Sequence, residues 1–229
     1  MNTRSIGPIG FCANGYVNPS GLRFLFNVEY SSDRFYIRFM EFIPSYLRAD
    51  ILKSFVDKKA YAQVATTNEE GVTSVRTVHI HFLPQKEWFV FNTHGRSQKA
   101  KDVLHTRKVS GCFWDDTNQI QYRWIAFAEL ITEKTHPHEM PLLQGLWKTM
   151  REETRLAYVL DHEGLAYDIP ELPATISVDE RPDTHCLVGF VPHTLDVHRF
   201  DPRGYRFGKR TVYVKKNQVW EESPSRLIY

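Results

Sequence analysis

The chain has 229 residues, of which 42% are hydrophobic and 14% aromatic, which is enough apolar material for one complete core. Charged residues make up 24% and the formal net charge is +2, a balance that argues against nucleic acid or a membrane surface as the main partner. No apolar run approaches the roughly 18 residues of a membrane span, and the N-terminus lacks the continuous apolar segment of a secretion signal.

Residues 1–40 are rich in Gly, Asn, Ser and aromatic residues and show weak periodicity. We therefore expect an N-terminal extension that precedes a domain over residues 41–229. The domain is predicted to begin with an amphipathic helix behind Pro44, because Leu47, Ile51 and Phe55 follow at helical spacing.

Short strand-like runs separated by polar turns come next. The turns fall near residues 68–71 and 84–86, where Asn, Gly and Pro interrupt the pattern. The predicted strands cover residues 61–67, 73–82, 88–92, 108–114 and 119–129. Short strands of this kind favour an antiparallel barrel or sandwich.

Two helices are expected among the strands. Ser97 is placed to cap a short helix over residues 97–104, and apolar residues at helical spacing predict a longer helix over residues 140–160. The proline-rich and acidic stretch 168–183 is interpreted as a loop. Closing strands are predicted over residues 187–191, 194–200 and 210–214.

Cysteine and histidine usage indicates neither a disulfide framework nor a metal site. Cys12, Cys112 and Cys186 are widely spaced and odd in number, which fits a reducing cytoplasm. Cys112 is expected on a strand as part of the core. His79 and His81 alternate as on a strand, but no metal-binding spacing occurs in the chain, so no catalytic metal is expected.

The segment with the clearest chemistry is Phe91-Asn92-Thr93-His94-Gly95-Arg96-Ser97-Gln98-Lys99. Here a strand leads through a glycine-containing turn into a helix, whose free N–H groups favour an anion. Thr93 and Ser97 add hydroxyls and Lys99 adds charge, while Arg76 stands on the neighbouring predicted strand. Together they predict a phosphate cradle. The alternative is a solvent-facing arginine, a simple helix cap and a solvated lysine.

These motifs resemble the pyridoxamine 5'-phosphate oxidase family. The resemblance rests on Ser74-Val75-Arg76-Thr77-Val78, on the ungapped F-x-T-x-x-x-S-x-K pattern from Phe91 to Lys99, and on Ile120-Gln121-Tyr122-Arg123. Arg206 to Arg210 and the closing Trp220 and Ser225-Arg226-Leu227 extend it over residues 44–229. It implies a mainly β fold with flanking helices, an antiparallel split β-barrel that binds FMN. The segment around Leu146-Trp147 looks closest to the oxidase-like members of less certain substrate.

The resemblance also implies roles for single residues. Arg76, Thr93, Ser97 and Lys99 would bind the FMN phosphate, and the backbone from Thr77 to Ile80 would run along the isoalloxazine ring. Gln121 and Arg210 would reach the flavin of a second subunit, so the chain is expected to be a homodimer. The full set of expected cofactor residues is Arg76, Thr77, Val78, His79, His81, Phe91, Asn92, Thr93, Ser97, Gln98, Lys99, Gln121, His198 and Arg210.

Three departures from the family pattern concern the substrate. His81 stands where the oxidases carry a lysine, His198 stands near the place of a tryptophan, and Arg206-Phe207-Gly208 keeps the arginine of R-x-H but loses the histidine. His81 and Arg206 are the substrate-binding candidates, and His81 or His198 are the candidates for orienting the reacting group. The expected function is an FMN-dependent oxidoreductase acting on a small molecule. The alternatives are an NAD(P)H-dependent flavin reductase of the same fold and a non-catalytic flavin or haem binder.

Overall fold

The computed structural model describes residues 43–56, 59–163, 177–217 and 219–224. The predicted N-terminal extension lies outside these residues. Internal contacts divide the chain into Met1–Glu41 and Phe42–Tyr229, and every element described below belongs to the second unit.

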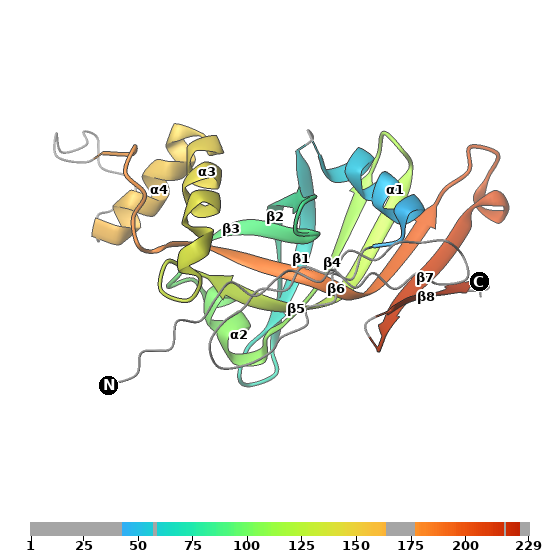
Figure 1. Cartoon of the computed structure of the whole chain (residues 1–229), viewed down its shortest axis with the longest axis horizontal. Coiled ribbons are helices and arrows are strands. Elements are labelled where there is room, and N and C mark those ends of the chain that lie inside the picture. Colours follow the sequence, from blue (N-terminus) through green and yellow to red (C-terminus); the bar gives the residue numbers. More distant parts are fainter. Residues whose placement is uncertain (1–42, 57–58, 164–176, 218, 225–229) are drawn as a thin grey trace, which may run out of the picture. The chain divides into compact units, whose positions relative to one another are not determined.

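Six antiparallel strands form a closed barrel. They are β1 (Ala60–Thr67), β2 (Thr73–Leu83), β3 (Trp88–His94), β4 (Lys108–Asp115), β5 (Ile120–Ile131) and β6 (His185–Arg199). Their order is β3-β2-β1-β4-β5-β6, and pairing of β3 with β6 closes the ring. The strands β7 (Lys209–Lys216) and β8 (Val219–Pro224) continue the sheet beyond β6 (Figure 1). The predicted fold class, a mainly β split barrel with flanking helices, is confirmed.

The barrel core consists of the inward side chains of all six strands. Helix α1 (Ser45–Phe55) adds Leu47, Ile51 and Phe55 to this core. The ring of Phe55 lies 4.7 Å from Phe113 and 5.3 Å from Tyr122, measured between ring centroids. The helix predicted behind Pro44 is therefore present, with Pro44 as its N-cap.

The strands around the barrel pair over very different lengths. β5 pairs with β6 from Ile120 to Ile131, while β2 pairs with β3 only from His81 to Leu83. Before His81, β2 has one strand neighbour among the described residues, which is β1. The barrel is thus split between β2 and β3.

Helix α2 (Gln98–Thr106) follows β3 and packs against β1, β3 and β5. The Ser97 hydroxyl accepts a hydrogen bond from the backbone N–H of Ala100 at 3.4 Å, so Ser97 is the N-cap that the sequence predicts. Arg107 ends the helix in the left-handed region with φ of 53°.

The single helix predicted over residues 140–160 is wrong. The structure has α3 (Met140–Thr149) and α4 (Glu152–Glu163), with extended backbone at Met150. In one straight helix, residues eleven apart would lie about 16 Å from each other along the axis. The break instead brings the rings of Trp147 and Tyr158 to 5.9 Å, edge to face, and this packing compensates for the lost turn.

Helix α3 covers part of the outer face of the barrel. Leu143 and Leu146 pack there with Val90, Ile131 and Leu187 in a second, smaller core. This core arises because the outer positions of β3, β5 and β6 are apolar where α3 covers them.

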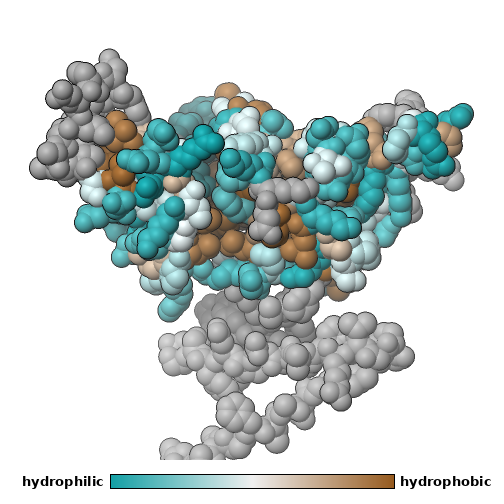
Figure 2. Space-filling view, turned by 90° about the horizontal axis from the view of Figure 1, so that it is seen from above, coloured by the Kyte–Doolittle hydropathy of each residue, from teal (hydrophilic) through white to brown (hydrophobic). Residues whose placement is uncertain are grey.

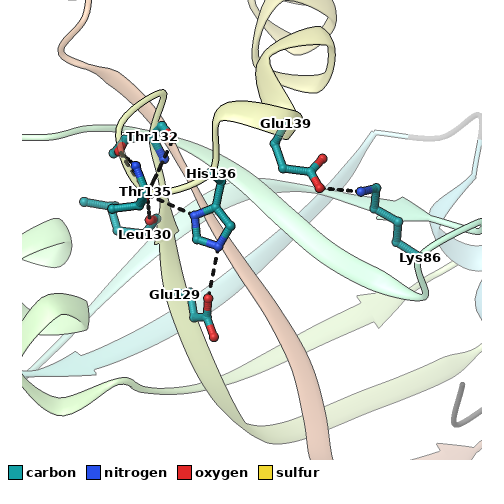
Figure 3. A network of polar contacts seen from close by, with 7 residues as sticks. All are labelled: Lys86, Glu129, Leu130, Thr132, Thr135, His136 and Glu139. Carbon is teal, nitrogen blue, oxygen red and sulfur yellow. Dashed lines mark hydrogen bonds and ion pairs between the residues drawn. The ribbon is translucent and has the colours of Figure 1, made fainter. Parts of the chain in front are cut away.

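A polar network fixes the connection between β5 and α3 (Figure 3). The Thr135 hydroxyl donates to the carbonyl of Leu130 at 3.0 Å, and His136 Nε2 lies 3.2 Å from the Glu129 carboxylate. The short 3₁₀ helix η1 (Pro137–Glu139) then begins, and Glu139 forms an ion pair with Lys86 of the β2–β3 hairpin. The network therefore links the start of α3 to β5 and to the β2–β3 hairpin.

The last part of the chain corrects two further predictions. The two strands expected over residues 187–191 and 194–200 are one strand, β6, with an irregular register at Pro192 and His193. A bulge tolerates Pro192, which has no N–H to donate. β8 and the 3₁₀ helix η2 (Tyr205–Phe207) were not predicted. The described part of the predicted loop, residues 177–183, contains no helix or strand.

Cys112 is not the core residue that the sequence predicts. It lies on β4 as expected, but the inward positions of that strand are Val109, Phe113 and Asp115, and Cys112 points to the opposite, half-exposed side. Alternation along a strand has two possible phases, and here the larger Phe113 is the residue that enters the core.

The outer surface of the barrel is only partly polar. In Figure 2, hydrophobic side chains gather between hydrophilic ones across the middle of the face seen from above. Val75 on β2 and Ile125 and Phe127 on β5 are exposed apolar residues. No helix in the described part of the chain is long and apolar enough to cross a membrane.

Candidate functional site

Arg76 lies on the inward side of β2, at the open end of the barrel. It shares this side with Val78, Ile80 and Phe82, which are buried, because alternate residues of a strand face the same way. Its guanidinium donates to the hydroxyl of Thr66 at 2.7 Å. That hydroxyl in turn donates to the carboxylate of Asp102 on α2 at 2.5 Å. Arg76 is therefore oriented from two other elements.

The start of α2 brings the remaining predicted cradle residues together. The hydroxyls of Thr93 and Ser97 lie 3.1 Å apart at the N-terminus of the helix. Gln98 donates to the Asp102 carboxylate at 2.8 Å, so its side chain points along the helix to the same acid that holds Thr66. Lys99 follows in the first turn and is half-buried.

Arg76 and Lys99 are close enough to affect each other electrostatically. Burial lowers the pKa of Lys99, and the positive charge of Arg76 lowers it further. Burial also lowers the pKa of Arg76, while the negative charge of Asp102 partly offsets that effect. Among the described residues, Lys99 has no carboxylate within ion-pair distance. A bound anion would relieve the repulsion and offset the cost of desolvation.

A free backbone edge lies beside this cationic group. From Thr73 to Ile80, β2 pairs with β1 on one side, and no described strand pairs with its other side. Beyond Val90, β6 is the one described strand that pairs with β3. The N–H and C=O groups along such an edge are available for hydrogen bonds with a ligand. A flat, polar ring system attached to a phosphate fits this combination of cations and free backbone.

Outward side chains next to the free edge form a row of aromatic rings. The rings of Tyr61 and His79 lie 5.2 Å apart, and those of His79 and His81 lie 4.2 Å apart. Burial and the neighbouring His79 lower the pKa of His81 to about 4. His81 is therefore neutral at pH 7 and carries no positive charge.

Gln121, His198 and Arg210 form a second group. Gln121 on β5 pairs with His198 on β6, and His198 pairs with Arg210 on β7, so the three stand in one row across the sheet. The His198 ring lies 4.0 Å from that of Phe200. Burial, followed by the charge of Arg210, lowers the pKa of His198.

Asp196 organises this second group. Its carboxylate accepts from Arg210 Nε at 3.0 Å and from Arg210 Nη2 at 2.8 Å, and it also pairs with Arg123. Burial on its own would raise the pKa of Asp196, but the hydrogen bonds from Arg210 and Arg123 outweigh it and hold the pKa below its usual value. Arg210 is thereby held in one orientation.

The two groups lie on opposite faces of the barrel wall. Arg76 shares the inward side of β2 with the buried Val78, whereas Gln121 and His198, which pair with each other, point outward. Arg206 belongs to the side of the second group, because it lies in η2 between β6 and β7, with its guanidinium 4.7 Å from the Phe207 ring.

Two of the expected cofactor residues do not line the cradle. Phe91 is fully buried in the barrel core. The Asn92 amide oxygen lies 2.9 Å from Nε2 of His185, on the outer side of β3 under α3 and α4. Burial lowers the pKa of His185 to about 3, with Arg181 and His94 adding to the effect.

Thr66, Asp102 and Asp196 contact site residues but were not identified from the sequence. Thr66 belongs to a strand separated from Arg76 by a turn, and only the register of β1 against β2 brings them together. Asp102 stands four residues after Gln98, a helical spacing that could have revealed their hydrogen bond. No group of described His, Cys, Asp and Glu residues is arranged to hold a metal ion.

Comparisons with known proteins identify similar sequences and folds. Residues 44–132 match the family model described as "Pyridoxamine 5'-phosphate oxidase, FMN-binding domain". A search of curated proteins gave no match. A pyridoxamine 5'-phosphate oxidase-related, FMN-binding protein from Nostoc punctiforme is 22% identical with a TM-score of 0.65, over 82% of this chain and 99% of that one.

PhzG from Burkholderia lata, solved with tetrahydrophenazine-1-carboxylic acid, is 16% identical with a TM-score of 0.54. That alignment covers 79% of this chain and 88% of PhzG. At these identities the two structures establish a shared fold. The resemblance to the pyridoxamine 5'-phosphate oxidase family is therefore confirmed, and the match to its FMN-binding domain lies in residues 44–132.

Proposed function

We propose that the chain binds FMN and acts as an FMN-dependent oxidoreductase on a small molecule. The observation that carries the proposal is the approach of two half-buried cations, Arg76 and Lys99, at the hydroxyl-lined start of α2. Arg76, Lys99, Thr93 and Ser97 would hold the phosphate. The free edge of β2 over Thr77 to Ile80 would offer backbone groups to the ring.

The site is proposed to be completed by a second copy of the chain. Gln121, His198 and Arg210 share the outer face of the sheet, away from the inward side that carries Arg76, so they would contact the FMN held by the partner. The exposed apolar residues Val75 and Ile125 on the outer barrel face are in keeping with a homodimer.

Bound FMN would supply a ring that accepts a hydride. The residues of this chain would bind and orient the substrate: neutral His81 by hydrogen bonding, and exposed Arg206 by attracting an anionic group. The site would resemble that of pyridoxamine or pyridoxine 5'-phosphate oxidase without the positive charge of a lysine at position 81. The cytoplasm is the proposed location, on the basis of the cysteine usage.

Removal of both cations tests the cradle. The double variant Arg76→Ala/Lys99→Ala is expected to weaken FMN binding by orders of magnitude, because each charge-assisted contact contributes about 1.5–3 kcal/mol. Lys101→Ala/Lys108→Ala removes two exposed positive charges, one in α2 and one at the start of β4, and is the control. Titration of the apoprotein with FMN measures both. Equal FMN affinity in the two double variants would refute the cradle.

Subunit mixing tests the shared site. Neither Arg76→Ala/Lys99→Ala nor Arg210→Ala homodimers should hold FMN well, but a mixed dimer contains one site with all its residues intact. Mixing the two variants after reversible dissociation should restore up to about one FMN per mixed dimer, which is about one per two dimers in the whole mixture, since half of the random pairs are mixed. No recovery in mixed dimers isolated with two different affinity tags would contradict a site built from two chains.

The reaction class follows from spectra of the purified protein. A flavin spectrum that bleaches anaerobically with pyridoxamine or pyridoxine 5'-phosphate supports the oxidase function. Bleaching by NADPH alone would assign a flavin reductase instead. A stable flavin spectrum with every donor would leave a flavin binder, and a Soret band would identify a haem binder.

A further inference from the structure

Asp196 and two arginines form a charged cluster on the outer face of the sheet. Asp196 on β6 stands opposite Arg123 in the pairing with β5, and Arg210 on β7 lies diagonally across from it. The carboxylate accepts hydrogen bonds from Nε and Nη2 of Arg210, at 3.0 and 2.8 Å, and its Oδ2 atom also pairs with Nη2 of Arg123. One carboxylate therefore contacts guanidinium groups from both neighbouring strands.

The carboxylate is the most enclosed member of this cluster. The side chain of Asp196 is 14% exposed, compared with 46% for Arg123 and 30% for Arg210. Burial alone would raise the pKa of Asp196, but the hydrogen bonds from the two arginines hold it below its usual value, so the carboxylate is ionised at neutral pH. A fixed charge in a partly enclosed place acts on neighbouring groups more strongly than a charge in open solvent.

The cluster shares its face of the sheet with the second group. Asp196 and His198 alternate with the core residues Leu195 and Val197, so both point outward, and Gln121 pairs with His198 on that face. Two residues of extended strand cover about 7 Å. A charge at that distance still acts on a ring that contacts His198, because ordinary ionic strength screens charges over about 8–10 Å.

We propose that Asp196 lowers the reduction potential of the FMN that the second group contacts. This inference rests on the proposed function and on its site shared between two chains. Reduction by two electrons with uptake of one proton leaves a negative charge on the flavin ring, which nearby arginines stabilise and a nearby carboxylate destabilises. Asp196 offsets part of the positive charge of Arg123 and Arg210 and so makes the reduced ring a stronger electron donor.

Charge variants of the FMN-loaded, full-length protein test the proposal. Asp196→Asn keeps an oxygen for Arg210 but removes the charge, so the midpoint potential should rise by about 30 mV, which is a tenfold change in the two-electron equilibrium. Asp196→Glu keeps the charge and should have nearly the potential of the parent protein. Anaerobic titration with dithionite against a reference dye, at one fixed pH, measures the potential. Glu221→Gln is the control, because Glu221 pairs with Lys216, about 20 Å along β7 from Arg210, and its loss should change nothing.

Arg123→Gln tests the opposite sign. The potential should fall, and the double variant Asp196→Asn/Arg123→Gln, which loses one charge of each sign, should stay near the parent value. A purely structural role of Asp196 would not produce shifts of opposite sign in the two single variants. An unchanged or lower potential in Asp196→Asn, or a higher one in Arg123→Gln, would overturn the inference while bound FMN still supports the proposed function. A parent protein that binds no FMN in titration would overturn both.

Discussion

The pairing of β5 with β6 and the pairing of β2 with β3 differ strongly in length. The first extends along the whole of β5, and the second is limited to the hairpin end at His81 to Leu83. Where pairing is complete, the inward positions are filled by aromatic rings such as Phe190 and Trp124. Where pairing fails, the inward position is Arg76, with Thr66 beside it. The fully paired strands β5 and β6, called the closed wall below, stabilise the barrel. The part of β2 before His81 that does not pair with β3, called the split wall below, carries polar groups that are available to a ligand.

The largest expected effect is in the closed wall. Phe190→Ala removes a buried ring that stacks on Phe89 at 5.6 Å and on Trp124 at 5.8 Å. The free energy of unfolding should fall by about 3–5 kcal/mol, as for other large-to-small changes in cores. Denaturant titration measures this loss. FMN affinity of the folded fraction should remain near that of the parent protein. A parallel loss of affinity would show that stability and FMN binding depend on the same packing.

Gly111 on β4 packs against Trp124 of β5, so a single added methyl group tests the packing of this part of the core. A Cβ there would lie 2.2 Å from Cζ2 of Trp124 and 2.7 Å from the backbone oxygen of Gln63. Gly111→Ala should therefore lower the free energy of unfolding by about 1–3 kcal/mol through overpacking. Gly145→Ala is the matched control, because a Cβ at Gly145 in α3 meets no atom within 4 Å. It should stabilise the protein by about 0.5–1 kcal/mol, the helix preference of Ala over Gly. A loss in both variants would contradict the packing argument.

A pH effect is expected where β3 and β6 meet under α3 and α4. The pKa of His185 falls from 6.5 in the unfolded chain to about 3 in the folded protein. Between these values the unfolded chain binds the extra proton, so acid favours unfolding, with a slope of up to about 1.4 kcal/mol per pH unit. Urea unfolding at pH 7.5, 6.5 and 5.5 should show this fall in stability.

His185→Gln, which keeps an amide N–H near Asn92, should flatten the pH slope even if it is less stable at pH 7.5. His105→Gln, at a half-exposed histidine of α2, should keep the slope of the parent protein. An unchanged slope in His185→Gln would show that His185 is not the titrating group.

The smallest expected effect is in the split wall. Thr66→Val keeps the shape of the side chain but removes the hydroxyl that accepts from Arg76 and donates to Asp102. FMN affinity should fall by about 1 kcal/mol, the usual contribution of one hydrogen bond. Thr67→Val is the control, because the Thr67 hydroxyl contacts Thr73 on the exposed side of the hairpin. Equal affinities in the two variants would remove Thr66 from the support of the cradle.

Most of the fold could be predicted because it rests on local patterns. The strands from β1 to β5 follow from alternation and from turn residues such as Asn68 and Gly71, and Ser97 marked the start of α2. The break between α3 and α4 depends instead on the contact of Trp147 with Tyr158, which no local preference encodes. Likewise, β6 continues through Pro192 because β5 remains paired on either side of the bulge.

The candidate site divides in the same way. Arg76, Thr93, Ser97 and Lys99 could be selected because their residue types and spacing are unusual together. Thr66 could not be selected, since it comes from a different strand and register decides which side chains meet. For Asp102 the sequence offered only its helical spacing from Gln98. Asp196 could not be identified from the sequence either, because only strand register brings it to its partners Arg123 on β5 and Arg210 on β7.

β6 exchanges one neighbour for another along its length. Its first part pairs with β3 as far as Phe190, and its last part pairs with β7 from Thr194 onward, with Pro192 between the two. The ring of six strands is therefore already complete before the β7–β8 hairpin begins. The connection of residues 200–208 can consequently change in length or composition without opening the barrel. In this architecture the hairpin that carries Arg210 and Lys215 is free to diversify while the barrel that supports it stays the same.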